Sequence, residues 1–363
     1  MPNEQNIKLV LKNGLEIKGR SFGFPDSTSG EVVFNTAMTG YPESLTDPSY
    51  KGQILILTYP LIGNYGVPSA DIENNLLKNF ESEKIHVSGL VISDYSSGSS
   101  HWKSHKSLSD WLIENNIPAV YGVDTRMLTK IIREKGSMPG KIIFENRNVE
   151  FYNPDKENLV EKVSTDKKII YGNGKHKIML IDCGVKFNII RRLLTRDTTV
   201  IRVPWDYDFT EDEYDGLFIS NGPGDPKMCD STINNLSLEI KKDKPVFGIC
   251  LGNQLLCLAA GGDTYKLKYG HRSHNQPVMQ DGTKKCFITS QNHGFAANPD
   301  SLGNEWQIFF TNLNDNTNEG LIHKEKMIFS TQFHPEASSG PTDTDFLFDL
   351  FIENIEKHKK VGK

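Results

Sequence analysis

The chain has 363 residues, 37% of them hydrophobic and 24% charged, and a net charge of −5. Its length favours two domains, and this balance of residues is typical of a soluble globular protein. The acidic excess argues against a nucleic-acid-binding protein, and no apolar stretch is long enough to span a membrane. Because residues 1–5 are too polar for a secretion signal, we expect a cytoplasmic protein.

Residues 1–150 are predicted to form a smaller, strand-rich α+β domain. Two β-prone runs, 7–12 and 15–21, flank Asn13 and Gly14. Because both of these residues tolerate positive φ, the pattern predicts a β-hairpin with a two-residue turn. Further short strands are expected at residues 32–34, 54–59 and 90–93.

The end of this domain is predicted to be helical, from Asp124 to Lys135. Asp124 or Thr125 can cap the start of the helix, and Gly136 ends it. Residues 151–176 are polar and lack periodicity, so we expect them to connect two domains.

Residues 177–363 have a different pattern, in which short apolar runs alternate with helical segments. The run 178–181 is almost entirely apolar, as expected of a strand that is covered on both faces. Alternating strands and helices predict an α/β fold with a doubly wound, mostly parallel sheet, which binds ligands at the carboxyl ends of its strands. Other strands are expected at 199–203, 216–219 and 245–249, and a helix with an apolar face over 346–355.

Five cysteines are present, none of them in a CxxC pair, which predicts free thiols rather than a zinc site or disulfides. Cys250 lies in the run 248–252, Gly-Ile-Cys-Leu-Gly, between a predicted strand and a predicted helix. The sharp turn of a nucleophile elbow needs small residues at these flanking positions. The helix start favours a thiolate, and the N–H of Leu251 can donate to an oxyanion. We therefore predict a catalytic nucleophile; the alternative, a buried structural cysteine, is the interpretation given to Cys257.

A base for this thiol is expected in the run 327–336, where an apolar strand ends at His334. Glu336 lies two residues further on, so in an extended chain its side chain points to the same side as the imidazole. The carboxylate can then orient the imidazole, and the imidazole can take the thiol proton. A packing or capping histidine is the simpler interpretation, but the elbow cysteine favours a catalytic triad of Cys250, His334 and Glu336.

The loop Asn221-Gly222-Pro223-Gly224 follows another predicted strand. Its glycines let backbone N–H groups approach a ligand closely, which suits a second oxyanion donor and a substrate cradle. Taken alone, the loop is equally compatible with an ordinary tight turn.

Together, these three motifs resemble those of the class I, or triad, glutamine amidotransferases, over residues 177–357. The first half is similar to the amino-terminal domain of the carbamoyl-phosphate synthetase small-subunit family, which other amidotransferases lack. This second resemblance lies in residues 33–50, 58–64 and 122–126. In the second half, residues 269–275, 291–295 and 333–337 are also similar to this small subunit.

The resemblance implies a set of glutamine contacts. Ser49 would reach the substrate from the first domain, and Gln254 can hold its α-amino or carboxylate end. Asn253 stands where many relatives have histidine, next to the triad rather than in it. The implied contacts are Ser49, Gly222, Gly224, Leu251, Gln254, Asn292, Gly294 and Phe295.

No metal site is predicted. His271 and His274 form an HxxH pattern, but on an expected polar loop without carboxylate support. His293 is expected to be structural or to lie at an interface. Residues 292–295 are predicted to form a second polar loop, after a strand at 286–290.

The resemblance further implies a glutamine-hydrolysing subunit, without a cofactor of its own, that makes ammonia for a larger synthetase subunit. No GxxxxGK[ST] motif occurs, so ATP and a divalent metal are expected on that partner. The first domain is expected to dock the partner and to form a wall of the active site. Two alternatives stay open: the amidotransferase subunit of another synthetase, and a stand-alone thiol hydrolase of γ-glutamyl amides.

Overall fold

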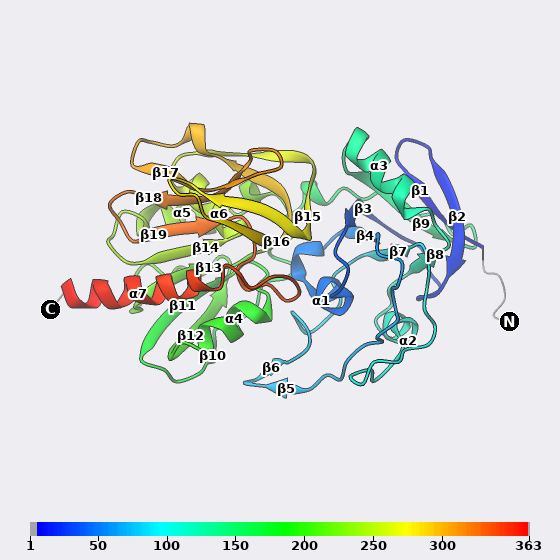
Figure 1. Ribbon diagram of the computed structural model, residues 1–363, viewed down its shortest axis with the longest axis horizontal. Helices are drawn as coiled ribbons and strands as arrows, with labels where there is room; N and C mark the ends of the chain where they lie inside the picture. Colours follow the sequence, from blue (N-terminus) through cyan, green and yellow to red (C-terminus); the bar gives the residue numbers. More distant parts are fainter. Residues whose placement is uncertain (1–5, 362–363) are drawn as a thin grey trace. The chain divides into compact units, whose positions relative to one another are not determined.

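The computed structural model describes residues 6–361 and divides into two compact units, Met1–Lys156 and Glu157–Lys363. The first unit is built on a closed sheet and the second on a large open sheet, and Figure 1 labels the elements of both. Within the described residues, no helix is both long and apolar enough to cross a membrane.

The closed sheet of the first unit has seven strands in the order β1-β2-β8-β7-β4-β3-β9, with β9 paired back to β1. Closure leaves no unpaired sheet edge. The strands are β1 (Asn6–Leu11), β2 (Glu16–Ser21), β3 (Thr28–Asn35), β4 (Gln53–Leu57), β7 (Gly89–Ile92), β8 (Ala119–Tyr121) and β9 (Met138–Phe144), beside a small hairpin of β5 (Ile72–Glu73) and β6 (Leu76–Leu77). The helices are α1 (Tyr41–Thr46), α2 (Leu108–Glu114) and α3 (Thr125–Lys135).

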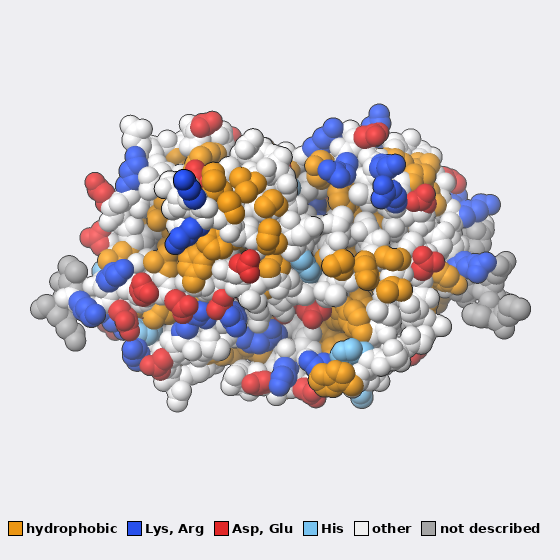
Figure 2. Space-filling view, viewed as in Figure 1, with side chains coloured by type: hydrophobic (Ala, Val, Ile, Leu, Met, Phe, Trp, Pro, Cys, Tyr) orange, Lys and Arg blue, Asp and Glu red, His pale blue; other side chains and the backbone are white. Residues whose placement is uncertain are grey.

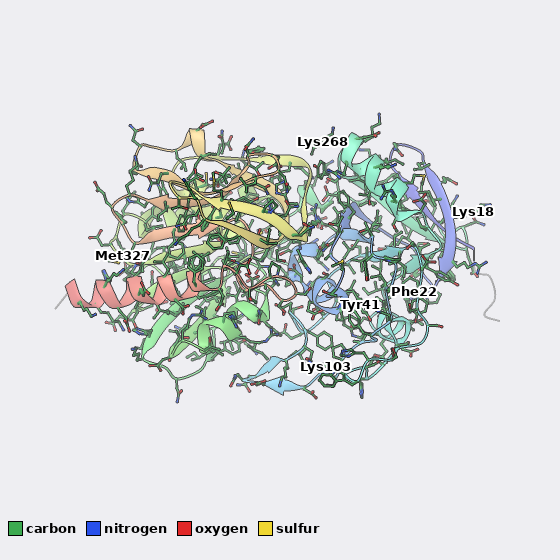
Figure 3. The ribbon with its side chains drawn as sticks, in the orientation of Figure 1. Lys18, Phe22, Tyr41, Lys103, Lys268 and Met327 are labelled. Atoms are coloured by element: carbon green, nitrogen blue, oxygen red, sulfur yellow. The ribbon has the colours of Figure 1, made fainter. Side chains whose placement is uncertain are left out.

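Aromatic side chains are part of the apolar core of this unit, to which β4, β7 and β8 also contribute. Phe22 stacks on Tyr95 with ring centroids 4.6 Å apart, and Tyr41 stacks on Tyr65 at 4.2 Å. Figure 3 labels Phe22 and Tyr41 among the side chains of the first unit. Each such pair adds about 0.5–1.5 kcal/mol beyond the area it buries.

The hairpin between β1 and β2 is present. Its last hydrogen-bonded pair is Leu11 and Leu15, so the loop that they enclose has three residues, 12–14, instead of the predicted two. Val10 pairs with Glu16, and the Leu11 N–H donates to the Leu15 carbonyl at 2.9 Å. Of the three loop residues, Gly14 alone has positive φ, 90°. The two-residue turn predicted for Asn-Gly was therefore wrong, because that turn needs positive φ at both positions.

The helix predicted at the end of this unit is α3. The Asp124 carboxylate caps it by accepting from the Met127 N–H at 2.8 Å. Gly136 ends it with a φ of 93°, a value that favours glycine. Both ends of α3 were therefore predictable from single residues.

The second unit contains a ten-stranded sheet with the order β10-β12-β11-β13-β14-β19-β18-β17-β15-β16. Five neighbouring strands, β12 to β19 in this order, are parallel, and the remaining pairs are antiparallel. The strands are β10 (Ile169–Tyr171), β11 (His176–Asp182), β12 (Thr198–Pro204), β13 (Gly216–Ile219), β14 (Val246–Ile249), β15 (Asp263–Gln280), β16 (Cys286–Asn298), β17 (Trp306–Asn312), β18 (Asn318–His323) and β19 (Ile328–Thr331).

Helices cover both faces of the parallel part, which gives the doubly wound α/β fold that the sequence predicts. Alternate residues of β13 show the two faces: Phe218 packs against Phe348 and Phe351 of α7, while Leu217 belongs to the core formed with α5 and α6. Residues i and i+1 of a strand point to opposite faces, so a continuous apolar run marks a strand covered twice. The helices are α4 (Phe187–Leu194), α5 (Asp230–Glu239), α6 (Leu251–Ala259) and α7 (Phe346–Val361).

Residues 157–176, the larger part of the predicted connection 151–176, pack into the second unit. Leu159 and Val160 are buried, and β10 pairs with β12. The Thr165 N–H donates to the Asp182 carboxylate at 2.7 Å. The segment is held by individual hydrogen bonds and a few apolar contacts, which produce no regular pattern in the sequence.

Two segments predicted to be polar loops are parts of long strands. His271 and His274 lie in β15, and residues 292–295 lie in β16. The two strands pair with register shifts, so their polar residues are not spaced in simple alternation. Buried polar residues on both strands hide the pattern further, which explains why the loop predictions were wrong.

Charges of both signs are interspersed on the face shown in Figure 2. Many exposed charges of the described residues pair, as Lys8 does with Glu16 at 2.9 Å and Lys175 with Glu356 at 3.1 Å. Exposed pairs of this kind contribute at most about 1 kcal/mol each. The stability of the fold therefore rests on its two cores.

Candidate active site

Cys250 lies at the corner between β14 and α6. Its backbone has φ 55° and ψ −101°, a conformation that non-glycine residues rarely adopt. The Cys250 N–H donates to the Thr331 carbonyl of β19 at 2.7 Å, and the Cys250 carbonyl accepts from the Asn253 N–H at 3.1 Å. These bonds hold the strained turn at the carboxyl ends of the parallel strands.

Glycine is required on both sides of this turn. A Cβ on Gly248 would lie 2.6 Å from the Gly252 carbonyl oxygen, and a Cβ on Gly252 would lie 2.4 Å from the Ile219 carbonyl oxygen. Both clashes are with backbone atoms, which cannot move aside without breaking the sheet or the helix. The glycine spacing of the sequence therefore has a steric cause.

His334 and Glu336 follow β19, and both are buried. The His334 Nδ1 lies 2.7 Å from the Glu336 Oε1. Because an ionised carboxylate only accepts hydrogen bonds, Nδ1 carries a proton and Nε2 is left for other chemistry. The His334 N–H donates to the Ser290 carbonyl at 2.9 Å, which fixes this loop beside β16.

The surroundings of His334 favour a protonated ring. Burial lowers its pKa, but the charges of Glu336 and then Cys250 outweigh burial and raise the pKa to about 10. The Cys250 Sγ is directed to the Asn292 carbonyl oxygen, 3.7 Å away, and the His334 Nε2 makes no hydrogen bond with a described residue. Contacts between catalytic groups often tighten only when substrate binds.

Lys186, a buried cation beside this pair, was not identified from the sequence. Its Nζ donates to the Glu336 Oε1 at 3.0 Å and to the Ala337 carbonyl at 2.6 Å. Burial raises the pKa of Glu336, but Lys186, followed by His334, outweighs burial and holds this pKa at about 2. The only sequence signal is that Lys186 lies between a strand and a helix, at the sheet edge where ligands bind.

Several of the predicted glutamine contacts lie around Cys250. The Gln254 Nε2 donates to the Phe295 carbonyl at 2.8 Å and to the Gln332 Oε1 at 3.1 Å. Asn292, three residues before Phe295, supplies the carbonyl that faces the Cys250 Sγ. Strand β16 therefore runs past both the nucleophile and the first turn of α6.

Gly222 and Leu251, the predicted oxyanion donors, are neighbours. A Cβ on Gly222 would lie 2.8 Å from the Leu251 Cδ2 and 2.1 Å from the Cys183 carbonyl oxygen, so glycine is required there too. Leu251 is the first residue of α6, where a helical N–H has no partner within the helix. Gly224 has a φ of 86° and lies beside Leu159. The role of each as a donor stays a prediction.

The last two predicted contacts, Ser49 and Gly294, lie in different units of the chain. Ser49 belongs to the first unit, in the short turn Pro48–Tyr50, where its N–H donates to the Asp47 carboxylate at 2.9 Å. Gly294 lies within β16, next to Arg272. Contact of either residue with glutamine stays a prediction.

Asn253 and Cys257 also lie on α6, in structural environments. Asn253 is buried, donates to the Gln332 Oε1 at 3.1 Å and accepts from the Ser330 hydroxyl at 2.8 Å. Burial raises the pKa of Cys257 to about 11. Cys257 therefore serves as the matched non-catalytic thiol for experiments on Cys250.

Two family profiles match the chain in succession. Residues 9–142 match the carbamoyl-phosphate synthase small chain, CPSase domain, and residues 179–354 match glutamine amidotransferase class-I. The carbamoyl phosphate synthase arginine-specific small chain of Saccharomyces cerevisiae is 50% identical over 363 residues, which cover 96% of this chain and 88% of the yeast protein.

Longer proteins contain a similar region. Multifunctional protein CAD of Squalus acanthias is 54% identical over 352 residues, 95% of this chain and 16% of that protein. The human mitochondrial carbamoyl-phosphate synthase [ammonia] is 50% identical over 360 residues, 98% of this chain and 24% of that protein. The chain therefore spans less than a quarter of the length of these two relatives.

Proposed function

Because the chain belongs to the carbamoyl-phosphate synthase small-chain family and carries its class I glutamine amidotransferase domain, we propose that it hydrolyses glutamine and supplies ammonia to a large synthetase chain. The observation that carries this proposal is the buried constellation of the strained Cys250 turn, His334 and Glu336. Each of the three residue types has a specific task in thiol-based amide hydrolysis.

Family membership alone leaves the source of nitrogen open, since the human relative is named for ammonia. The triad favours glutamine for this chain. A cysteine held at positive φ at a helix start, with a His–Glu pair beside it, is costly to keep without a use. A chain whose nitrogen source is free ammonia would not require such a nucleophile.

In the proposed first step, the His334 Nε2 takes the proton of the Cys250 thiol, and the resulting thiolate attacks the carbon of the glutamine side-chain amide. The carbonyl oxygen becomes an oxyanion, which the Leu251 and Gly222 N–H groups are proposed to stabilise. His334 gives its Nε2 proton to the amide nitrogen, the C–N bond breaks, and ammonia leaves a glutamyl thioester on Cys250. Glu336 keeps the imidazole in the required orientation.

In the second step, water takes the place that ammonia has left. His334 removes a proton from this water, the resulting hydroxide attacks the thioester carbon, and the C–S bond breaks. Glutamate leaves, and the proton returns to the thiolate of Cys250. Lys186 keeps Glu336 ionised throughout, because it holds the carboxylate pKa far below neutral pH.

The ammonia is proposed to serve carbamoyl phosphate synthesis from bicarbonate and ATP on the large chain. Membership of a small-chain family implies association with such a chain. Free ammonia would be mostly protonated at neutral pH and lost as a nucleophile, so transfer within a complex preserves it. The first unit, which matches the small-chain CPSase domain, is the proposed docking part.

The test is glutamate release from glutamine by the purified chain, alone and with a carbamoyl-phosphate synthase large chain. Cys250→Ser should lower hydrolysis by about 10³-fold or more, because a serine at this position is a poor nucleophile without a matched base. Cys257→Ser, on the same helix, should keep the activity. Stimulation by the large chain is expected for the wild type and for Cys257→Ser.

Two outcomes contradict the proposal in different ways. Hydrolysis that survives in Cys250→Ser overturns the triad. Fast hydrolysis that ignores the large chain leaves the triad intact but indicates a stand-alone hydrolase instead of a synthetase subunit.

A further inference from the structure

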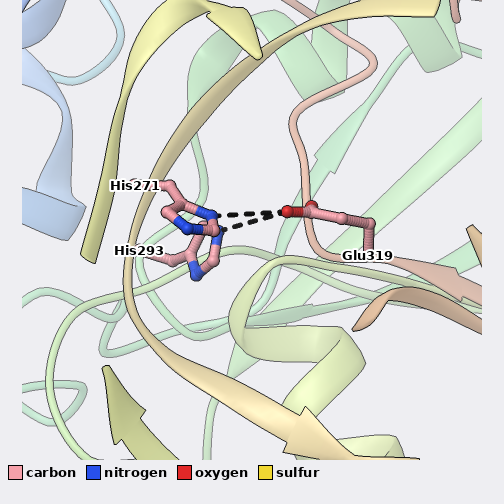
Figure 4. Close-up of side chains that lie close together, drawn as sticks. All are labelled: His271, His293 and Glu319. Carbon is pink, nitrogen blue, oxygen red and sulfur yellow. Dashed lines mark ion pairs between the residues drawn. The ribbon is translucent and has the colours of Figure 1, made fainter. Parts of the chain in front are cut away.

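Four buried polar side chains converge inside the second unit, on three different strands. His271 comes from β15, Gln291 and His293 from β16, and Glu319 from β18. Figure 4 shows both imidazole rings beside the Glu319 carboxylate. None of the four belongs to the proposed triad.

The nitrogen and oxygen atoms of these four side chains lie close to one another. The His271 Nδ1 is 3.0 Å from the Gln291 Oε1 and 3.4 Å from the Glu319 Oε1. The His293 Nε2 is 3.2 Å from the Gln291 Oε1 and 4.0 Å from the Glu319 Oε1. Ligands of a tetrahedral Zn²⁺, bound at about 2.0–2.1 Å, are separated by about 3.4 Å. Two of the four separations are shorter than this value, one equals it and one exceeds it.

The Gln291 amide presents its oxygen to the two histidines, and its hydrogen bonds determine this orientation. The Thr289 hydroxyl donates to the Gln276 carbonyl at 2.9 Å, so its oxygen accepts from the Gln291 Nε2 at 3.2 Å. The other amide atom, facing the histidines, must therefore be Oε1.

His293 likewise presents a lone pair. Its Nδ1 lies 2.8 Å from the Phe295 carbonyl oxygen, which can only accept, so Nδ1 carries the proton. In the neutral ring, Nε2 is then an acceptor. It faces two further acceptors, the Gln291 Oε1 and the Glu319 carboxylate.

The cluster therefore has more acceptors than donors. Three lone-pair atoms face the one proton that the His271 Nδ1 can supply. The Asn312 amide donates to the Glu319 Oε1 at 2.8 Å, and its nitrogen lies 3.5 Å from the His271 Nδ1. The Glu319 Oε2 is buried and has no hydrogen-bond partner among the described residues. Buried acceptors without donors are costly in protein interiors unless a cation satisfies them.

We propose that His271, Gln291, His293 and Glu319 bind a divalent cation of the zinc class. Two imidazole nitrogens and two oxygens form a ligand set that suits borderline ions such as Zn²⁺ and Co²⁺. The Asp315 carboxylate, 2.7 Å from the His271 Nε2, is the outer partner that orients a metal-binding histidine. The ion takes the place of the proton on the His271 Nδ1.

Such an ion would fix β16 beside the nucleophile. Gln291 and His293 flank Asn292, whose carbonyl faces the Cys250 Sγ. A bound ion thus holds the neighbours of a residue that the proposed function places at the substrate. The metal site itself does not depend on that function and is tested without glutamine.

The test uses the full chain carrying Cys250→Ser, which removes the thiol that could bind metal together with His334. Co²⁺ is titrated into this chain by calorimetry and by visible absorption. One ion per chain is expected, with the intense absorption bands of tetrahedral Co²⁺, and Zn²⁺ should displace it. Adding Glu319→Gln should abolish the bands and weaken binding by more than the roughly 10–100-fold that loss of an outer partner causes.

Glu356→Gln in the Cys250→Ser background is the control, because it removes an exposed carboxylate of the same unit that pairs with Lys175 and is not a ligand. It should keep one-to-one binding and the tetrahedral spectrum. Should Glu319→Gln fail to fold, Gln291→Glu provides the second arm, since an added carboxylate ligand should tighten Co²⁺ binding. Absence of tetrahedral Co²⁺ in the Cys250→Ser chain, or equal binding in the ligand and control variants, overturns the proposal.

Discussion

His334 and His271 are both buried in the second unit, and a carboxylate oxygen lies 2.7 Å from one ring nitrogen of each. Burial lowers the pKa of both rings, and neighbouring carboxylates outweigh it, to about 10 for His334 and about 9 for His271. The two histidines differ in the surroundings of their other ring nitrogen. That of His334 has no hydrogen-bond partner among the described residues, whereas that of His271 faces Gln291 and Glu319.

This difference separates two uses of a buried histidine. A ring with one nitrogen held by a carboxylate and the other open can pass a proton to a substrate. A ring with acceptors at both nitrogens can give up its proton only to an ion that replaces it. A raised pKa is common to both, so the open nitrogen, rather than the pKa, identifies the general acid and base.

The largest expected effect comes from replacing each histidine by asparagine. His334→Asn should lower the kcat of glutamine hydrolysis by about 10³-fold or more, since it removes the proton carrier of both steps. His271→Asn should lower it by less than about 10-fold. Steady-state glutamate release measures both. Equal losses would remove the distinction drawn between the open and the enclosed ring.

Lys186→Met should have the next largest effect. Loss of the buried cation leaves Glu336 paired with His334 alone, so kcat should fall on the order of 10-fold while the KM for glutamine stays close to that of the wild type. Unfolding free energy should fall by about 3–5 kcal/mol, as for other broken buried ion pairs. Arg202→Met, which breaks the buried pair with Asp182, is the control: a similar loss of stability with kcat retained. If kcat falls equally in both variants, Lys186 acts only through stability.

The smallest effect concerns stability at acid pH. The pKa of Glu336 is about 2 in the folded chain, below the ordinary value of 4.5, so the carboxylate stabilises the fold above about pH 4.5. This contribution, roughly 3 kcal/mol, is lost as pH falls through the window toward 2. Urea unfolding between about pH 6 and pH 3 should show a steeper loss for the wild type than for Glu336→Gln. Parallel curves would mean that the carboxylate is not held in its charged form.

Features with a local cause were predictable from the sequence. Glycine is required on both sides of Cys250 because a Cβ there would clash with the backbone of the same region. Helix α3 begins after its cap Asp124 and ends at Gly136. Strands covered on both faces, such as β11, can be recognised in the sequence by their continuous apolar runs. These features gave the α/β class and the position of the nucleophile.

Features with distant causes were not predictable in this way. Lys186 meets Glu336 across 150 positions of the chain, and nothing in its own neighbourhood marks it as buried. His271 and His293 were read as loop residues, because their partner Glu319 comes from a third strand. The polar character of such residues reflects pairing in three dimensions, which a single sequence does not display.

The backbone of Cys250 has a consequence for how this position can change over time. A non-glycine residue at φ 55° and ψ −101° costs about 1–3 kcal/mol, which glycine would recover. Glycine would also remove the sulfur, so at this one position the more stable chain is the inactive one. Selection for stability alone would favour glycine at this position. The cysteine is therefore expected to persist only while its chemistry is needed.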